Sequence, residues 1–375
     1  MRWFFLAFLL IYSGMHLLVW WGVRPLLPSD RRLHLPLLAW TLLMIAAPPL
    51  TRLLERFGWG DAAVATAWIG YLWMGFLWLA FALFTALAFW NGVVRFGGLR
   101  YPGLRRWVLY GPRPALCVLF LVVVAGLWAF FEARELRVET VRLAVGTLPP
   151  GRSQLRIVQV SDLHLGLINH RPLLEEIIAR SRGLQPDLVA VTGDLLDAQP
   201  DHLEGLAPLW LQLQPPLGKF AVVGNHEVYA GREHSLQFLA EAGFRLLIDE
   251  AVEVDGIQVV GIPDPAWGSS RGDAALLTTV DPAKVTVLLK HRPWVEPAAI
   301  GRFTLQLSGH AHRGQIFPFT LLTGLVYPLQ DGLYQLGREC WLYTSRGTGS
   351  WGPPMRLLSP PEITVIELVA AAKEK

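Results

Sequence analysis

Five apolar runs in the second half of the chain each end in residues that can bind a metal ion or transfer a proton. The residues that follow these runs are Asp162 and His164, Asp194 and Asp197, Asn225 with His226 and Glu227, His291, and finally His310 and His312. One such group is common, because Asp and Asn form turns at strand ends. Five in succession, three of them directly after glycine, indicate a site. Carboxylate and amide oxygens combined with imidazole nitrogens favour Mn, Fe, Zn or Co over Ca.

The runs have the composition of β-strands and alternate with helical segments. Rich in Val and Ile, they predict strands at 155–160, 187–193 and 219–224, and further strands in IQVVGI, KVTVLL, FTLQLS, CWLYTS and EITVIEL. Helical spacing at 171–181 and 201–213 separates the first three strands. This alternation predicts an α/β domain, in which the carboxyl ends of strands meet where sites form.

Composition divides the chain into a membrane region and a globular region. The chain is 53% hydrophobic with a mean hydropathy of +0.37, which is too apolar for an ordinary soluble domain. The first 150 residues contain six acidic residues and no lysine. We predict a transmembrane anchor at 1–135, a linker at 136–150, an α/β domain at 151–370 and a tail at 371–375. The predicted spans, each near the 20 residues that a bilayer requires, are about 3–23, 34–51, 63–90 and 115–131.

The apolar region is more typical of an anchor than of a transport pathway. Its spans hold almost no ionisable group besides His16, whereas transport pathways usually place charged residues at depth. The first span has too long an apolar core for a signal peptide, and no small-residue cleavage site follows it. Cys117 and Cys340 form no metal-binding CxxC pattern. The net charge of +3 gives no reason to expect a nucleic-acid partner.

Arginine distribution gives an orientation for the four spans. The loops after the first and third spans carry eight arginines, against six on the opposite side. Because cytoplasmic loops carry an excess of basic residues, this difference places both termini outside. We therefore expect a multi-pass protein of the bacterial cytoplasmic membrane with its α/β domain on the extracytoplasmic side.

The residues after the strands match a known family. The series Asp162-x-His164, Gly193-Asp194-x-x-Asp197, Gly224-Asn225-His226-Glu227, His291 and Gly309-His310-x-His312 resembles the calcineurin-like metallophosphoesterases. GHAHRGQIFPF and SRGTGSWGPPMRLLSPPEITVIEL resemble the branch of membrane-associated bacterial phosphodiesterases, which has a vertebrate transmembrane relative. The resemblance covers about 150–370. One departure is Arg313, where that branch usually has glycine.

The resemblance implies a fold and a set of roles. The fold would be an α/β/β/α sandwich of two sheets with two divalent metal ions, of which Mn is favoured and Fe, Zn, Co or Mg are alternatives. One ion would be held by Asp162, His164 and His312, and the other by Asn225, His291 and His310. Asp194 would bridge the two ions, and His226 would approach the phosphate without binding metal. Two such cations can clamp a phosphate and activate water, so His310 and His312 would each serve a different metal from one turn.

Five further residues have two interpretations each. Asp197 and Glu227 can support the loops or a ligating histidine more readily than they can bind metal themselves. Asp264 can line the cleft or form a plain turn. Arg313 and Arg346 can hold a phosphate through their forked donors, or form surface salt bridges.

The resemblance and the spans together predict a membrane-anchored phosphodiesterase or pyrophosphatase. Its partner would be the lipid bilayer, and its substrate a phosphorylated lipid or lipid-linked molecule such as a UDP-diacylglucosamine-type precursor of lipid A. That substrate requires access from the cytoplasm, which conflicts with the orientation given by the arginines. The alternative is a membrane sensor or scaffold whose metal-binding domain is not catalytic.

Overall fold

The computed structural model describes residues 2–146, 148–197, 202–268 and 270–371. The chain forms two compact units, Met1–Phe131 with Gly352–Met355, and Glu132–Trp351 with Arg356–Lys375. Each unit is described by itself below. Of the predicted tail at 371–375, positions 372–375 lie outside the described residues.

The first unit contains four helices that are long and apolar enough to cross a membrane. They are α1 (Arg2–Val23), α2 (His34–Arg56), α3 (Gly60–Arg100) and α4 (Pro112–Glu132). Helix α2 continues through Pro48 and Pro49 and ends five residues beyond the predicted limit of 51. Helix α3 has 41 residues and is about 60 Å long, roughly twice the thickness of a bilayer core. The predicted span at 63–90 is therefore part of a longer helix, which continues for ten residues beyond it.

His16, the one ionisable residue singled out within the predicted spans, has two hydrogen-bonding neighbours. Trp73 Nε1 donates a hydrogen bond to its Nε2 at 2.9 Å, and its Nδ1 lies 2.9 Å from the carbonyl oxygen of Tyr12. Both ring nitrogens are thus satisfied between α1 and α3, which fits a packing residue.

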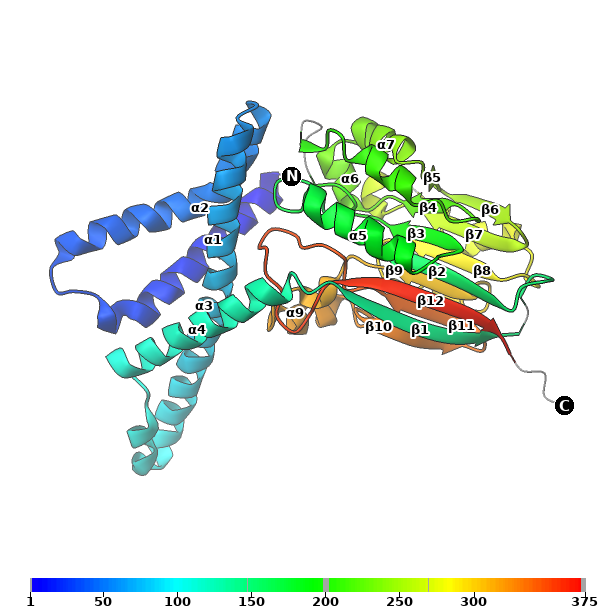
Figure 1. Ribbon diagram of the computed structural model, residues 1–375. Coiled ribbons are helices and arrows are strands. Elements are labelled where there is room, and N and C mark those ends of the chain that lie inside the picture. The colour runs from blue at the N-terminus through cyan, green and yellow to red at the C-terminus, as the bar shows by residue number, and fades with distance from the viewer. Residues whose placement is uncertain (1, 147, 198–201, 269, 372–375) are drawn as a thin grey trace. The chain divides into compact units, whose positions relative to one another are not determined.

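The second unit is built on two six-stranded sheets, as the fold prediction expected (Figure 1). In spatial order the first sheet contains β1 (Arg137–Val145), β12 (Glu362–Ala370), β2 (Gln154–Val160), β3 (Leu188–Thr192), β4 (Lys219–Val222) and β5 (Arg245–Leu246). The second contains β10 (Gly332–Gly337), β11 (Cys340–Thr344), β9 (Leu305–Ser308), β8 (Thr286–Lys290), β7 (Ile257–Ile262) and β6 (Glu250–Val254). Strands β2 to β5 are parallel, as are β7, β8, β9 and β11.

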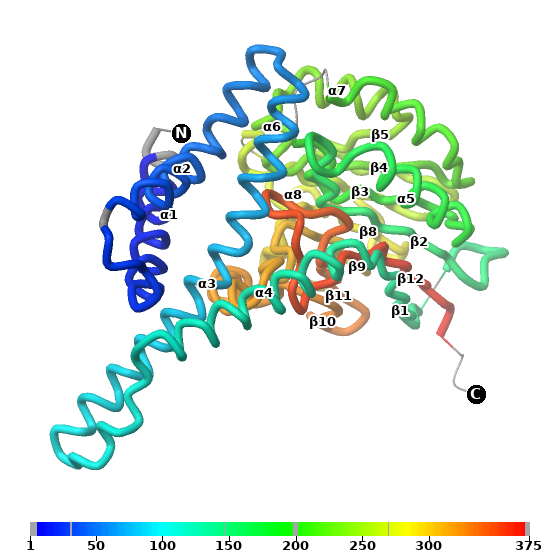
Figure 2. Tube along the Cα trace, turned by 60° about the vertical axis from the view of Figure 1, so that its left-hand side comes forward, coloured from blue at the N-terminus to red at the C-terminus, as the bar shows by residue number. Residues whose placement is uncertain are grey.

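Part of the predicted linker at 136–150 is a strand. Strand β1 pairs in parallel with β12, from Arg137 opposite Glu362 to Val145 opposite Ala370. The last strand of the chain thus lies between β1 and β2, as the tube in Figure 2 shows. Strand β1 is at the sheet edge, and most of its side chains are at least partly exposed. The strand was not predicted because charged and polar residues interrupt its apolar pattern.

Helices cover the outer faces of both sheets. Helices α5 (Arg171–Gly183) and α7 (Arg232–Glu241) lie beside the first sheet (Figure 1). Helix α8 (Asp273–Leu276) packs on the second sheet through Leu276. The segment 201–213, predicted to be α-helical, instead contains the short 3-10 helix η5 (Ala207–Gln212). A core of side chains from both sheets, including Ile157, Phe220 and Val287, fills the space between them.

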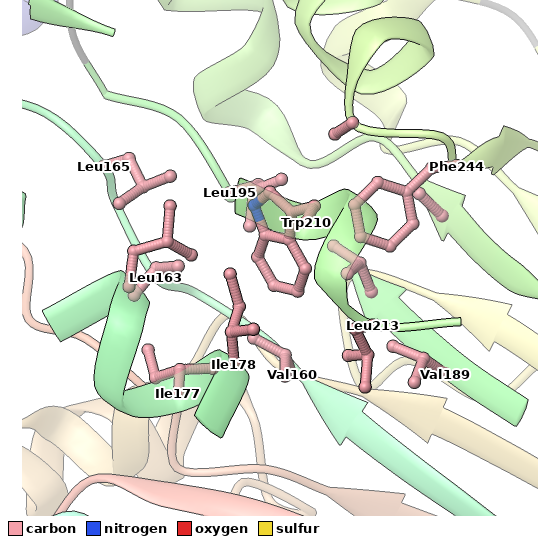
Figure 3. Packing of buried hydrophobic residues seen from close by; sticks show 14 of the residues in the cluster. Val160, Leu163, Leu165, Ile177, Ile178, Val189, Leu195, Trp210, Leu213 and Phe244 are labelled. Carbon is pink, nitrogen blue, oxygen red and sulfur yellow. The ribbon is translucent and has the colours of Figure 1, made fainter. Parts of the chain in front are cut away.

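A second core beneath α5 and η5 fixes the loops that carry the site. Trp210 and Phe244 lie within it, together with Leu163, Leu165 and Leu195 (Figure 3). These leucines alternate in sequence with Asp162, His164 and Asp194. The buried leucines therefore anchor the loops, and this fixes the positions of the polar residues next to them.

Candidate metal centre

Five strands from two sheets deliver the predicted ligands to one place. Asp162 and His164 follow β2, Asp194 follows β3, and Asn225 opens α6 (Asn225–Ala230) three residues after the end of β4. In the other sheet, His291 directly follows β8, and His310 and His312 follow β9. Because these strands run in parallel within each sheet, their carboxyl ends share one edge.

The ligand atoms form two clusters. Asp162, His164 and His312 form one, and Asp194, His291 and His310 form the other; the ligand atoms within each cluster lie within 4.8 Å of one another. In the first, His164 Nε2 is 3.2 Å from His312 Nε2, which is 3.3 Å from Asp162 Oδ1. In the second, His291 Nε2 is 3.1 Å from Asp194 Oδ2 and 3.0 Å from His310 Nδ1.

These separations fit metal coordination. Ligand atoms bound about 2.1 Å from one cation in octahedral geometry lie about 3 Å apart. The side-chain oxygen of Asn225 is buried and accepts no hydrogen bond from the described residues. A buried acceptor without a donor is costly unless a cation satisfies it. The donor set therefore suits two borderline divalent ions such as Mn, Fe, Zn or Co.

The backbone of the ligands is strained. Asp162, His164, Asp194, His310 and His312 all have φ between 48° and 69°. Residues with a side chain rarely occupy this left-handed region, and doing so costs on the order of 1 kcal/mol or more each. Tight turns after β2, β3 and β9 thus aim these five side chains inward at the expense of local stability.

Two of the glycines are required by close approach. A Cβ on Gly224 would lie 2.1 Å from Asp194 Oδ1, and a Cβ on Gly309 would lie 2.1 Å from Asp162 Oδ2. Any side chain at these positions would therefore displace a ligand carboxylate. This explains two of the three glycines that precede ligands in the sequence.

Contacts behind the ligands orient three of the histidine rings. His291 Nδ1 lies 2.8 Å from the carbonyl oxygen of Thr192, so Nε2 faces the cluster. His310 Nε2 lies 2.9 Å from the hydroxyl of Tyr327, which leaves Nδ1 to face the cluster. Arg356 Nη2 lies 3.0 Å from His312 Nδ1. Tyr327 and Arg356 were not singled out in the sequence.

His226 lies beside both clusters. Its ring Nδ1 is 2.8 Å from Asp197 Oδ1, and its backbone N–H donates to Asp194 Oδ1 at 2.8 Å. Nε2 is consequently the nitrogen left to face a substrate. Its ring also packs edge-on against His164, with centroids 4.6 Å apart. Asp197 thus supports a histidine, which is one of the two interpretations of that residue.

Burial and charge set the protonation of the site. Burial lowers the pKa of His226, but Asp194 and Asp197 more than offset this and raise it to about 9. Burial also lowers the pKa of His291, but the negative charge of Asp194 outweighs this effect and raises the pKa to about 10. Burial lowers the pKa of His164 and of His310 to about 3. Burial alone would raise the pKa of Asp194, but His291 and His226 hold it well below its usual range.

Glu227 ties two ligand loops together. Its carboxylate accepts hydrogen bonds from the backbone N–H groups of Asp194, Leu195, Leu196 and Gly224 at 2.7–3.2 Å. The side chain is buried, and burial raises its pKa. Its place is therefore behind the ligands.

We expect Glu227→Gln to destabilise the second unit by about 2–3 kcal/mol, because the new amide group must face backbone donors. Thermal unfolding of the detergent-solubilised protein measures the effect as a lower Tm. Glu241→Gln, on the exposed face of α7, is the matched control. Equal Tm values for the two variants would contradict this role.

Arg356 is a fully buried positioning residue. Besides His312, its guanidinium donates to the carbonyl oxygens of Arg346, Gly349 and Ser359. Ser359 Oγ in turn donates to the carbonyl oxygen of His312 at 2.7 Å. Arg356 and Ser359 therefore fix His312 through its ring and its backbone, respectively.

Lysine cannot supply the fork of donors that Arg356 provides. We expect Arg356→Lys to weaken metal binding about 10- to 100-fold, as is usual when a residue behind a ligand is changed. Isothermal titration of the metal-free protein with Mn measures this, with the exposed Arg302→Lys as the control. An unchanged Mn affinity in Arg356→Lys would refute the assignment.

The remaining predicted residues lie in ion pairs. Asp264 is buried, accepts from Arg292 Nε at 2.6 Å and caps a short 3-10 helix through Ala266 N. Arg313 Nη1 lies 3.2 Å from Asp331 Oδ2. Arg346 contacts the carboxylates of Glu139 at 2.5 Å and Glu362 at 2.6 Å. Both arginines thus form salt bridges, which is one of their two interpretations.

Sequence comparisons relate this chain to phosphoesterases. The family model for calcineurin-like phosphoesterase matches residues 155–314. An Aquifex aeolicus protein, described as an uncharacterized metallophosphoesterase, is 37% identical over 258 residues, covering 67% of this chain and 98% of the relative. The zebrafish transmembrane protein with metallophosphoesterase domain is 33% identical over 280 residues, covering 69% of this chain and 63% of the relative. A crystal structure of Pseudomonas putida nuclease MPE shares 18% identity, with a TM-score of 0.28 over 52% of this chain and 78% of that chain.

The fold and the paired ligand clusters define a dinuclear metallohydrolase. The extent and identity of the Aquifex match place this chain in the metallophosphoesterase family, whose members are metal-dependent phosphoester hydrolases with two divalent ions. The family resemblance expected from the strand-end residues is confirmed.

Proposed function

We propose that this chain is a membrane-anchored phosphodiesterase or pyrophosphatase that uses two divalent metal ions. The observation that carries the proposal is the meeting of two ligand clusters with His226 beside both. When bound, the ions would supply positive charge to a phosphate and activate water. Asp162, His164 and His312 would hold one ion, Asn225, His291 and His310 the other, and Asp194 both.

The protein groups would complete the reaction. The Asp197 carboxylate holds Nδ1 of His226, so that Nε2–H can protonate the oxygen that leaves phosphorus. The carboxylate of Asp194 accepts a hydrogen bond from the backbone N–H of His226. This bond would fix the position of His226, the general acid, relative to Asp194, the ligand shared by both ions. Glu227 and Arg356 fix the loops but do not touch substrate.

A lipid or lipid-linked substrate is the second part of the proposal. It is supported by the four candidate spans and by a relative whose name describes a transmembrane protein. Only four residues separate the end of α4 at Glu132 from Arg137, the first residue of the catalytic sheet. The five steps from Glu132 to Arg137 span at most about 18 Å, so the domain would stay close to the bilayer.

The class of reaction is tested with bis-p-nitrophenyl phosphate and the detergent-purified full-length protein. We expect hydrolysis with added Mn, loss after chelation, and recovery when Mn is returned. Hydrolysis that persists without metal would contradict the proposal. A fully metal-loaded protein that hydrolyses neither this diester nor any phospholipid would favour the scaffold alternative.

The side of the membrane separates the two substrate classes. An extracytoplasmic domain favours phospholipids or undecaprenyl-type phosphoesters, and a cytoplasmic domain favours a UDP-diacylglucosamine-type precursor. Leu211→Cys in a Cys117→Ser background places an exposed thiol on the catalytic unit. We expect it to react with an impermeant maleimide in spheroplasts. Reaction only after lysis would place the domain in the cytoplasm.

A further inference from the structure

A segment beside the metal centre has the composition of a membrane-contacting surface. Between Arg313 and Asp331 the chain contains no charged residue over positions 314–330. The middle of this segment forms helix α9 (Phe319–Val326), with the sequence FTLLTGLV. Uncharged runs of this length are unusual on the surface of a globular domain, where charged residues normally dominate.

The apolar side chains of this segment are exposed rather than buried. Leu325 is 80% exposed, Leu321 65% and Val326 60%, and no residue of α9 is fully buried. Phe317, Phe319 and Leu322 add to the same exposed set. A contiguous apolar surface of this kind marks a contact with a membrane or another molecule.

This surface is connected directly to the ligands. Tyr327, the residue after α9, has its hydroxyl 2.9 Å from His310 Nε2. At the other end, Thr320 Oγ1 donates to the carbonyl oxygen of Arg313, which follows His312. Trp351, half exposed, packs its ring against that of His226, with centroids 5.5 Å apart. Aromatic residues of this kind are enriched at membrane–water interfaces.

The end of the last candidate span lies next to the start of this surface. Glu132 is the last residue of α4 and belongs to the catalytic unit. Its carboxylate accepts hydrogen bonds from the backbone N–H groups of Leu358 and Ser359 at 3.2 and 2.9 Å. The carbonyl oxygen of the adjacent Leu357 accepts a hydrogen bond from Phe317 N at 3.1 Å, two residues before α9 begins. The chain that leaves the last candidate span is therefore hydrogen-bonded into the same segment that pairs with Phe317.

We propose that Phe317 and α9 form a surface that inserts into the lipid interface beside the metal centre. Helices that expose Leu and Phe bind such interfaces through their apolar face. Where the proposed lipid substrate is correct, and only then, this contact would also present a lipid phosphate to the site without removing its chains from the bilayer. The contact itself is measured without catalysis.

The experiment uses the full-length protein in phosphatidylcholine–phosphatidylglycerol nanodiscs. In the Cys117→Ser background, Leu325→Cys is labelled with a polarity-sensitive nitrobenzoxadiazole probe; Cys340 is buried. Leu321→Cys is the second position, and Leu211→Cys, exposed on η5, is the matched control. We expect blue-shifted emission at 325 and 321, with quenching by nitroxide lipids and resistance to iodide. The control should show the opposite order.

Quenching by iodide at 325 or 321, to the same degree as at 211, would overturn the proposal. Resistance to both quenchers would also overturn it, since it would mean that protein, such as a second copy of the chain, covers α9. Hydrolysis of bis-p-nitrophenyl phosphate by the same discs separates the two claims. Lipid quenching without hydrolysis would retain the α9 contact and count against the proposed function, and hydrolysis with iodide quenching would do the reverse.

Discussion

Replacement of Asp194 by Ala should reduce the Mn-dependent hydrolysis of bis-p-nitrophenyl phosphate by on the order of a thousandfold or more. Asp194 reaches both clusters: its Oδ2 lies 3.1 Å from His291 Nε2, and its carboxylate lies within 4.8 Å of ring nitrogens of His164 and His226. Without it, both sets of ligands would lose a carboxylate that could help to hold a divalent ion. The initial rate at saturating Mn measures the effect.

The control for Asp194→Ala must remove a carboxylate elsewhere. Asp255→Ala suits this purpose, since Asp255 is exposed and pairs with Arg152 far along the chain from the ligands. We expect it to retain the wild-type rate. An Asp194→Ala protein that binds two Mn ions and hydrolyses the diester at more than a tenth of the wild-type rate would contradict the assignment of Asp194 as the shared ligand.

Replacement of His226 by Ala should lower the rate by about 10²- to 10⁴-fold, the usual contribution of a positioned general acid. The loss should depend on the leaving group. Phenolate needs a proton more than p-nitrophenolate does, so diphenyl phosphate should lose more activity than bis-p-nitrophenyl phosphate. Metal binding should be almost unchanged, because no ligand has been removed.

Two comparisons make the His226 result specific. His170→Ala removes an exposed histidine at the start of α5 and should leave both rates unaltered. Asp197→Asn keeps the size of the side chain but weakens its hold on His226 Nδ1, and should show a smaller loss with the same leaving-group dependence. Equal losses for the two substrates in His226→Ala would exclude proton donation as the role of His226.

The strand-end residues could be predicted from the sequence because their signal is local. Each β-type run ends in a polar residue, and parallel strands bring such ends together whatever the loops between them. This was sufficient to expect Asp162, Asp194 and His310 at one edge. The structure also agrees with the positions of the main strands and with four apolar helices.

The supporting residues could not be predicted in the same way, because their contacts link distant parts of the chain. Tyr327 contacts His310 from 17 residues further along the chain, after helix α9, and Arg356 contacts His312 from 44 residues further along. Edge strand β1 escaped detection because its polar side chains face solvent, and its partner β12 is more than 200 residues further on. The exposure of the apolar side chains of α9 could not be predicted either, because composition does not show whether another part of the chain packs on a helix.

The most direct test of the account is a titration of the metal-free protein with Mn, in which bound metal and hydrolysis of bis-p-nitrophenyl phosphate are measured on the same samples. With two clusters sharing Asp194, activity should reach its plateau only when two Mn ions are bound per chain. In Asn225→Ala, the plateau should be lost and one of the two ions should bind more weakly. Full activity with a single bound ion, or with none, would contradict a dinuclear centre.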